Sequence, residues 1–372
     1  MRKKINIAVW WVRDYETGTR DTLGGLERWT RDIVRHLVMK GYEVNIYQKS
    51  KVLFEDDYNG GKLYGVVSSK NFIGNITFYQ KIKKLVPSNE LVLFLSQDLV
   101  WGSDFKKSVA VNHGVWWSSR QNKIKRWLIE YFNGKYLRRT QKTICVDTNY
   151  INWVIESVQK SHDLLDRMVY IPNYFDDQLF KTNVRNINTT VIKILFPRRI
   201  MGLSIFSEPR GGSDCINAVA KIIKEGYNVH LTMLGEGNLT DNLKQLTKSL
   251  GIEEFVEFKT AQFDEIASYY EANDVVMVPS RFSEGTSLSA IEALASNCFV
   301  ISSCVGGLQN LPLFPPYGIM TEPHPEKLAE SLKFYITNRK KIIDTEKNVF
   351  VLDQFRMENW SSSVMSILEQ IK

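Results

Sequence analysis

One stretch of the sequence, residues 274–307, constrains the fold more than any other. It begins with the apolar, largely β-branched run 275–278, which predicts a buried strand. A polar loop follows, and residues 286–296 then place apolar side chains at helical spacing. Residues 299–303 are strand-like again and precede two glycines. A strand, a loop, a helix and a second strand form the repeating unit of a parallel α/β sheet.

Two carboxylates, Glu284 and Glu292, flank the start of that predicted helix. A helix N-terminus offers unpaired backbone N–H groups to an anion, and carboxylates accept hydrogen bonds from hydroxyl groups. The combination predicts a site for a ligand that carries both phosphate and hydroxyl groups.

The rest of the chain repeats this alternation in two halves, separated by the polar, irregular segment 177–191. We therefore expect an α/β protein with two doubly wound domains, 1–184 and 185–353, and a C-terminal helix at about 354–372 that packs back on the first domain. Expected strands lie at 5–10, 44–47, 63–67, 91–96, 108–112, 144–147 and 169–173, and then at 192–196, 229–234, 255–258, 275–278 and 299–303.

Composition narrows the class of protein. The 372 residues are 44% hydrophobic and 24% charged, as in ordinary globular proteins. The sequence has no apolar run of membrane-spanning length, and Arg13 and Asp14 interrupt the short apolar run near the N-terminus, so we expect neither a transmembrane helix nor a signal peptide. The scattered cysteines Cys145, Cys215, Cys298 and Cys304 lack the spacing of a metal site, and we expect free thiols in a cytoplasmic protein.

The first half of the chain is basic. Its 184 residues hold 29 Lys and Arg against 19 Asp and Glu, whereas the remainder holds 19 against 22. Much of the excess lies in residues 119–142, a predicted helix in which Lys and Arg alternate with Trp, Tyr and Phe. This pattern is typical of a helix that packs on the sheet with a solvated basic face, and equally of one that contacts anionic lipid headgroups. No recognised nucleic-acid-binding motif accompanies the charge.

Two further features of the first half lie where α/β sheets bind ligands. Gly24 and Gly25 separate a predicted strand and loop from a helix, which indicates either a tight turn or an anion site. His113 follows the end of the strand at 108–112, so it is either a structural histidine or part of a site.

Taken together, six motifs in order resemble the retaining glycosyltransferases of family 4. These motifs are G-G-x-E-R at 24–28, P-N-x-x-D at 172–176, L-G-x-G at 234–237, D-V-x-x-x-P-S at 274–280, a glutamate pair with seven residues between its members that ends in E-A-x-A, and the trailing Gly306-Gly307. The resemblance spans most of the chain and implies the GT-B fold, with two Rossmann-like domains facing across a cleft.

The resemblance also implies residue roles. Glu292 would hold the ribose of a nucleotide-sugar donor, and Glu284 would hold hydroxyls of the transferred sugar. Arg199 and Arg210 would neutralise the diphosphate, and His113 would line the sugar site. The catalytic residues would thus be Glu284, His113 and Arg199, and the donor-binding residues Gly24, Gly25, Arg199, Arg210, Gly235, Glu284, Gly285, Thr286, Ser287, Leu288 and Glu292.

The sequence departs from the family pattern at several of these positions. Arg198 stands where the family usually has glycine, Arg210 replaces a lysine, and Tyr174 replaces a glycine. The loop before Arg210 is also longer than usual, so Arg198 is an alternative second cation for the diphosphate.

The function implied is transfer of a hexose-type sugar from a UDP-, GDP- or dTDP-linked donor, with no metal or other cofactor. The acceptor would be a glycan or a lipid-linked molecule, in the synthesis of a cell-surface polysaccharide at the cytoplasmic membrane face. Two alternatives stay open: a nucleotide-sugar epimerase or hydrolase on the same fold, and a non-catalytic GT-B subunit.

Overall fold

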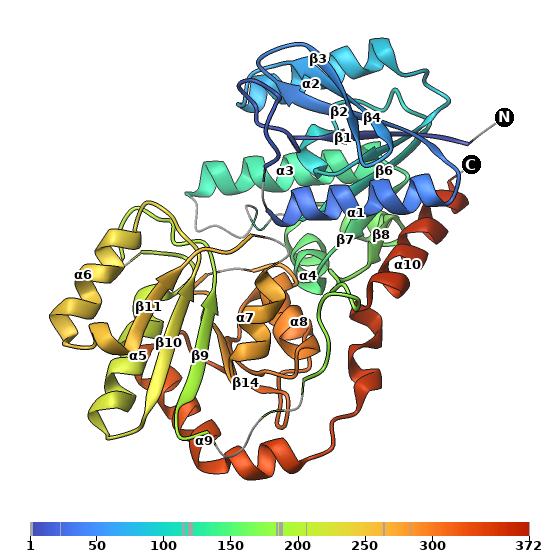
Figure 1. The fold of residues 1–372 in the computed structure, drawn as a ribbon. Coiled ribbons are helices and arrows are strands. Elements are labelled where there is room, and N and C mark those ends of the chain that lie inside the picture. The colour runs from blue at the N-terminus through green and yellow to red at the C-terminus, as the bar shows by residue number, and fades with distance from the viewer. Residues whose placement is uncertain are drawn as a thin grey trace. The chain divides into compact units, whose positions relative to one another are not determined.

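The computed structural model describes residues 3–22, 24–113, 115, 117, 122–183, 185, 189–205, 207–262, 265–282 and 284–371. The chain forms two compact units, residues 1–172 with 360–372 and residues 173–359. Each unit is built around one largely or wholly parallel sheet with helices on it, so the predicted α/β class with two Rossmann-like domains is confirmed (Figure 1).

The sheet of the first unit has eight strands among the described residues, in the order β3-β4-β2-β1-β5-β6-β7-β8. All neighbours pair in parallel except β3 with β4. The strands and helices are β1 (Lys4–Val9), α1 (Gly25–Met39), β2 (Glu43–Ser50), β3 (Phe54–Tyr58), β4 (Gly61–Val67), α2 (Phe72–Leu85), β5 (Leu91–Phe94), β6 (Lys107–Asn112), α3 (Lys123–Arg139), β7 (Lys142–Cys145), α4 (Thr148–Ser157) and β8 (Met168–Tyr170), with short 3-10 helices at Gln97–Leu99 and Ser161–Arg167.

Strand β3 is an element that the sequence analysis missed. Its acidic sequence, Phe-Glu-Asp-Asp-Tyr, gives little strand signal, and it lies at the edge of the sheet where polar side chains meet water. The turn after it is Asn59-Gly60, with φ of 52° and 86°. Two left-handed residues of this type make the tight hairpin turn whose twist matches paired strands, so this dipeptide was the available signal.

The sheet of the second unit has six parallel strands among the described residues, in the order β11-β10-β9-β12-β13-β14. Its elements are β9 (Ile192–Pro197), α5 (Gly212–Lys224), β10 (Val229–Leu234), α6 (Thr240–Leu250), β11 (Val256–Lys259), α7 (Ile266–Ala272), β12 (Val275–Val278), α8 (Leu288–Ala295), β13 (Phe299–Ser303), β14 (Gly318–Thr321), α9 (Pro325–Asp344) and α10 (Met357–Gln370), with 3-10 helices at Glu253–Phe255, Gly306–Asn310 and Val349–Phe355; most of α10 belongs to the first unit.

Alternate side chains of these strands build a core on each face of the second sheet. Val275 and Met277 of β12 pack in one cluster with α5 and α9, whereas Val276 and Val278 pack in the other with α7 and α8 (Figure 1). Successive side chains of a strand point to opposite faces, which is why a sheet covered on both sides needs continuous apolar strands.

The two structural units divide the chain differently from the boundaries that we expected at 184 and about 354. Phe175 and Phe180 are buried in the second unit's core, and the amide of Asn173 donates to the carbonyl oxygen of Thr286 at 2.7 Å. At the other end, Trp360 of α10 packs edge-on against Trp29 of α1 in the first unit, with ring centroids 5.0 Å apart. The positions of the two unit boundaries therefore follow from side-chain packing and not from the polar composition of residues 177–191.

Two predicted helices have different limits in the structure. The helix expected at 286–296 is α8, which begins at Leu288 because Ser287 is extended and acts as its N-cap residue. The basic helix expected at 119–142 is α3, which ends at Arg139 because Thr140 is extended, and Lys142 begins β7. Residues 119–121 of that prediction lie outside the described residues.

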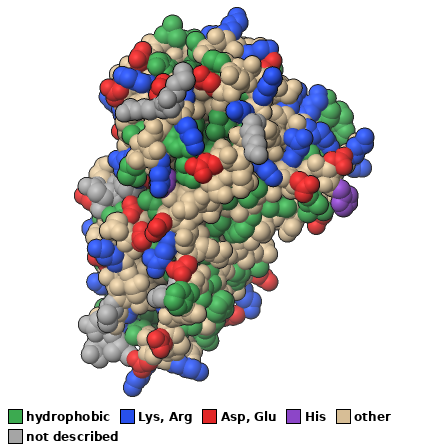
Figure 2. Space-filling view, turned by 90° about the vertical axis from the view of Figure 1, so that its right-hand side faces the viewer, with side chains coloured by type: hydrophobic (Ala, Val, Ile, Leu, Met, Phe, Trp, Pro, Cys, Tyr) green, Lys and Arg blue, Asp and Glu red, His purple; other side chains and the backbone are tan. Residues whose placement is uncertain are grey.

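Three further findings concern the cysteines, the hydropathy of the helices and the charges on the surface. All four cysteines are free thiols, three of them buried and Cys304 exposed. No helix of the described residues is long and apolar enough to cross a membrane. On the face shown in Figure 2, Lys and Arg side chains are spread among apolar and acidic ones, and no single charge sign covers it.

Candidate functional site

Glu284 is the centre of a charged cluster at the carboxyl end of β12. Its Oε2 accepts hydrogen bonds from Nη2 of Arg198 at 2.6 Å and from Oγ of Ser280 at 2.9 Å, and it also pairs with Nη1 of Arg210. The carboxylate side chain is only 12% exposed. Burial alone would raise the pKa of Glu284, but the two guanidinium groups outweigh it and the pKa is lowered. Glu284 is therefore held ionised between two cations.

Two glycines fix the backbone of Glu284. The N–H of Gly307 donates to the carbonyl oxygen of Glu284 at 2.7 Å. Gly306 has a φ of +53°, and a Cβ at this position would lie 2.2 Å from the same oxygen. Only glycine fits this approach, which gives the trailing Gly306-Gly307 motif a physical purpose.

Arg198, and not Arg199, is the arginine that reaches Glu284. Arg198 is 8% exposed and also donates from Nη1 to Oγ of Ser287 at 2.8 Å. Arg199 is exposed, because adjacent residues after a strand point in opposite directions. Gly235 packs on the backbone of Arg198. The φ of Gly235 is +143°, and a Cβ on this residue would lie 2.3 Å from the carbonyl oxygen of Arg198.

Arg210 is placed by the loop that enters α5. The buried carboxylate of Glu208 accepts hydrogen bonds from the backbone N–H of Arg210 at 2.8 Å and of Gly212 at 2.6 Å. Burial raises the pKa of Glu208 in spite of these bonds. Burial and the nearby Arg198 lower the pKa of Arg210, as expected for two cations held close together.

Helix α8 contributes its N-terminus and Glu292. Thr286 and Ser287 are buried in the segment before the helix, and Leu288 is its first residue. Glu292 lies about one turn further on and is 3% exposed; its Oε2 accepts a hydrogen bond from the hydroxyl of Tyr270 at 2.8 Å. Burial, with Glu292 beside it, raises the pKa of Tyr270 well above its usual value, so the phenol donates as a neutral group.

Sequence reasoning missed two supporting contacts of this site. Tyr270 comes from α7, where an aromatic residue at helical spacing has no signal beyond core packing. Arg281 forms a two-pronged ion pair with Asp214 of α5, Nε to Oδ2 at 2.5 Å and Nη2 to Oδ1 at 2.7 Å. This pair ties the loop before Glu284 to the helix after Arg210, 67 residues away in the sequence.

In the first unit, the predicted glycine pair begins a helix without unusual geometry. α1 starts at Gly25, and Gly24 before it is extended, with φ of 176°, a conformation open to any residue. The backbone itself therefore does not require glycine at Gly24.

His113 lies at the carboxyl end of β6 in the first unit. Its ring packs edge-on against Trp29 with centroids 5.1 Å apart, and its Nε2 is buried without a hydrogen-bond partner among the described residues. Burial lowers the pKa of His113 to about 3, so the ring is neutral at physiological pH.

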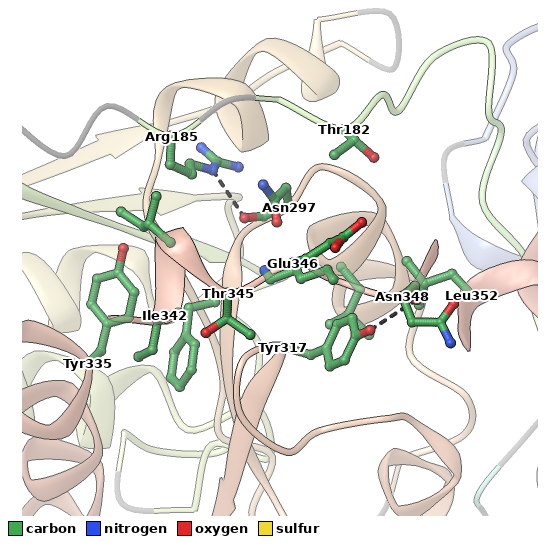
Figure 3. A pocket seen from close by; sticks show the side chains of 14 residues that line it. Thr182, Arg185, Asn297, Tyr317, Tyr335, Ile342, Thr345, Glu346, Asn348 and Leu352 are labelled. Atoms are coloured by element: carbon green, nitrogen blue, oxygen red, sulfur yellow. Dashed lines mark hydrogen bonds between the residues drawn. The ribbon is translucent and has the colours of Figure 1, made fainter. Parts of the chain in front are cut away.

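A separate cavity of about 270 Å³ lies at the opposite end of α8 from Glu284 (Figure 3). There the guanidinium of Arg185 donates to the carbonyl oxygens of Asn297 at 3.1 Å and Glu271 at 2.9 Å, among others. Phe299, which begins β13, also lines the cavity, so it lies at the amino end of the sheet. Parallel sheets bind their ligands at the carboxyl end, so this cavity does not lie where the fold places a ligand.

Comparison with known proteins finds a family model that matches part of the second unit. Residues 198–338 match the family model described as Glycosyl transferases group 1. An uncharacterized glycosyltransferase of Haemophilus influenzae is 23% identical over 371 residues, which cover 94% of this chain and 95% of the relative. Uncharacterized glycosyltransferase MJ1607 of Methanocaldococcus jannaschii is 28% identical over 163 residues, 42% of this chain and 41% of that relative.

Solved structures match over the whole chain. Sucrose-phosphate synthase from Thermosynechococcus elongatus has a TM-score of 0.78 at 16% identity, covering 99% of each chain. Anabaena Alr3699/HepE in complex with UDP and glucose has a TM-score of 0.76 at 16% identity, covering 99% of this chain and 100% of the other. These likenesses establish the GT-B fold.

The chain thus carries a glycosyl transferases group 1 domain on a GT-B fold, and the protein is a transferase enzyme of the glycosyltransferase class. The cluster around Glu284 lies within the matched residues 198–338.

Proposed function

We propose that this protein is a retaining glycosyltransferase of family 4 that transfers a hexose-type sugar from a nucleotide-diphosphate donor to a glycan or lipid-linked acceptor, in cell-surface polysaccharide synthesis. The observation that carries the proposal is the convergence of Arg198 and Arg210 on Glu284, next to the N-terminus of α8.

The two arginines supply charge where the reaction needs it. The bond between C1 of the sugar and the diphosphate breaks with its electron pair going to the diphosphate, which gains negative charge. Arg198 and Arg210 stabilise that charge, together with the N–H groups at the start of α8. This arrangement supports a mechanism without a metal ion, because guanidinium groups take the place of a divalent cation.

Glu284 and Glu292 have different tasks in this proposal. Glu284 accepts hydrogen bonds from hydroxyls of the transferred sugar, and Glu292, oriented by Tyr270, accepts them from the ribose of the nucleotide. The acceptor hydroxyl attacks C1 on the face that the diphosphate leaves, which retains the configuration. The proton of that hydroxyl departs with the diphosphate.

Thermal stabilisation by UDP-, GDP- and dTDP-linked sugars tests the donor, followed by turnover with candidate acceptors. We expect one nucleotide series to raise the melting temperature, and nucleotide release to require an acceptor. A changed sugar without any acceptor would indicate an epimerase, nucleotide release into water alone a hydrolase, and binding without turnover a non-catalytic subunit. No stabilisation by any nucleotide sugar would contradict the proposal.

We also propose that α3 attaches the protein to the cytoplasmic membrane surface. Ile124, Trp127 and Tyr131 of this helix are 72%, 57% and 43% exposed, and its cations Lys123 and Lys125 are exposed beside them. Apolar and aromatic side chains next to lysines suit the headgroup region of an anionic bilayer, where each cation contributes roughly 1 kcal/mol.

Charge reversal tests this attachment. Changing Lys123, Lys125 and Arg126 to Glu is expected to abolish sedimentation with anionic liposomes. Reversal of the exposed Lys224, Lys244 and Lys248 of the second unit is the matched control and should leave sedimentation intact. Equal loss in both variants, or persistent binding by the first, would contradict attachment through α3.

A further inference from the structure

The first unit contains a pocket of about 1090 Å³ at the carboxyl end of its sheet. Its lining has two parts. A polar part follows strands β5 and β6, and an apolar part comes mainly from the helices and strand ends around it. The polar part includes Ser96, Gln97, Asp98, Asn112 and His113, and the apolar part includes Leu26, Phe72, Leu95, Val111, Leu128, Ile129 and Phe132.

The apolar part is continuous from α2 to α3. The ring of Phe72 packs edge-on against that of Phe132, with centroids 5.2 Å apart, and against Trp101 at 4.6 Å. Sugar hydroxyls laid along this wall would lose their hydrogen bonds to water without replacement, which is unfavourable. A hydrocarbon chain has no such bonds to lose and gains from the burial.

The polar part offers hydrogen-bonding atoms that the protein does not use. Nε2 of His113 and Oδ1 of Asn112 are buried and have no partner among the described residues. Asn112 is held in place because its Nδ2 donates to Oε1 of Gln97 at 2.9 Å, and Gln97 donates to the hydroxyl of Tyr150 at 2.7 Å. Buried polar atoms of this kind normally have a partner, so they indicate that a polar group of a ligand binds here.

A cation stands among the lining residues. Lys125 of α3 lines the pocket, is exposed, and has no carboxylate within ion-pair distance among the described residues. Lys70, also in the lining, pairs with Glu16 at 3.3 Å. Lys125 is thus placed to meet an anionic group of a bound molecule.

We propose that this pocket binds an acceptor in which a phosphate links a sugar to a hydrocarbon chain, taken from a lipid bilayer. The chain lies along the wall of Phe72, Leu128 and Phe132, the phosphate meets Lys125, and the sugar hydroxyls meet His113 and Asn112. The inference rests on the proposed function for the reaction itself, and it decides between the glycan and the lipid-linked acceptor in favour of the second.

Alkyl monophosphates of six, eight and ten carbons, used below their micelle concentrations, test the pocket by calorimetry on the full chain. We expect the affinity to rise by about fourfold for each added methylene, the factor for burying one in an apolar site. Leu128→Gln should remove most of this dependence on chain length. Ile124→Gln, on the same helix and 72% exposed but outside the lining, should not.

The phosphate contact has its own matched pair of variants. Lys125→Gln should weaken binding of octyl phosphate about tenfold or more but leave octanol unaffected, whereas Lys123→Gln should change neither. Equal effects of Leu128→Gln and Ile124→Gln, or no dependence on chain length, would overturn the inference.

Nucleotide-sugar stabilisation, measured on the same preparations, separates the two proposals. Stabilisation without alkyl phosphate binding would overturn the pocket inference alone. Alkyl phosphate binding without nucleotide-sugar stabilisation would support the pocket and contradict the proposed transferase reaction.

Discussion

The two units place different chemistry at the carboxyl ends of similar sheets. In the second unit, ionised groups meet: Arg198 and Arg210 share the carboxylate of Glu284. In the first unit, the pocket at the corresponding edge combines a wall of apolar side chains with a polar part, in which burial keeps His113 neutral. The charged site is matched by a family model, at residues 198–338, whereas the apolar pocket lies outside that match. One architecture thus carries two sites of different chemistry.

Among the substitutions that test this difference between the units, removal of the Glu284 carboxylate should have the largest effect, on turnover. Glu284→Ala leaves the buried guanidinium group of Arg198 and the partly exposed one of Arg210 without their carboxylate, and in the proposed reaction it removes a contact to the transferred sugar. We expect turnover to fall about 100-fold or more, with a smaller change in nucleotide affinity. Kinetics and calorimetry measure the two separately, with Glu284→Gln as a variant of the same shape. Wild-type turnover in Glu284→Ala would refute the role.

The pair Arg198 and Arg199 gives the next largest contrast. Arg198→Gln should weaken nucleotide-diphosphate binding by about 1.5–3 kcal/mol, as expected for a lost bond between charged groups. Arg199→Gln should change it little, because the Arg199 side chain is exposed. Calorimetric titration with the nucleotide diphosphate compares them. If Arg199→Gln proved the weaker binder, the charged cluster described around Glu284 would not be the diphosphate site.

Glu292 should have a smaller effect, on nucleotide affinity alone. Glu292→Ala is expected to weaken binding by roughly 1–3 kcal/mol, since it removes one hydrogen-bonding group for the ribose. Tyr270→Phe removes only the hydroxyl that orients Glu292, and its effect should be smaller than that of Glu292→Ala. Unchanged binding in Glu292→Ala would exclude the ribose contact.

The smallest expected effect concerns the pH dependence of stability. Burial lowers the pKa of His113 from 6.5 to about 3. Between these values the unfolded chain binds a proton that the folded protein does not, so His113 makes stability fall as the pH drops below about 6.5. In the His113→Gln variant, the loss of unfolding free energy between pH 7.5 and 5.5 should be about 1 kcal/mol smaller than in the wild type. Equal dependence of the unfolding free energy on pH in the two proteins would show that folding does not lower the pKa of His113.

Much of the fold could be predicted because apolar strands and amphipathic helices leave periodic signals. The predicted runs at 192–196, 229–234, 275–278 and 299–303 are strands in the structure. The edge strand Phe54–Tyr58 left no such signal, because its three central side chains are acidic and exposed. Hydrophobic periodicity in the sequence therefore predicts buried strands and helices better than exposed ones.

The site was predictable only in part, for a physical reason. Motif spacing identified Glu284 and Glu292, but it could not show which of two consecutive arginines points inward. That depends on the direction of each side chain at the end of β9, where Arg198 is buried and Arg199 exposed. Tyr270 and the Arg281–Asp214 pair depend on contacts between distant segments. The pocket of the first unit likewise exists only because α2 and α3 lie against the same sheet edge.

The pairing of Glu284 with two arginines has a consequence for selectivity. Each of these three groups already has a partner within the protein. An inorganic anion that drew the arginines away would leave a buried carboxylate uncompensated, which is strongly unfavourable. A free sugar could pair with the carboxylate but would give the arginines nothing in exchange. A molecule that joins a diphosphate to a sugar, as the proposed donor does, would replace both halves of the interaction at once, so the ion pairs of the unliganded site would favour the intact donor over either half alone.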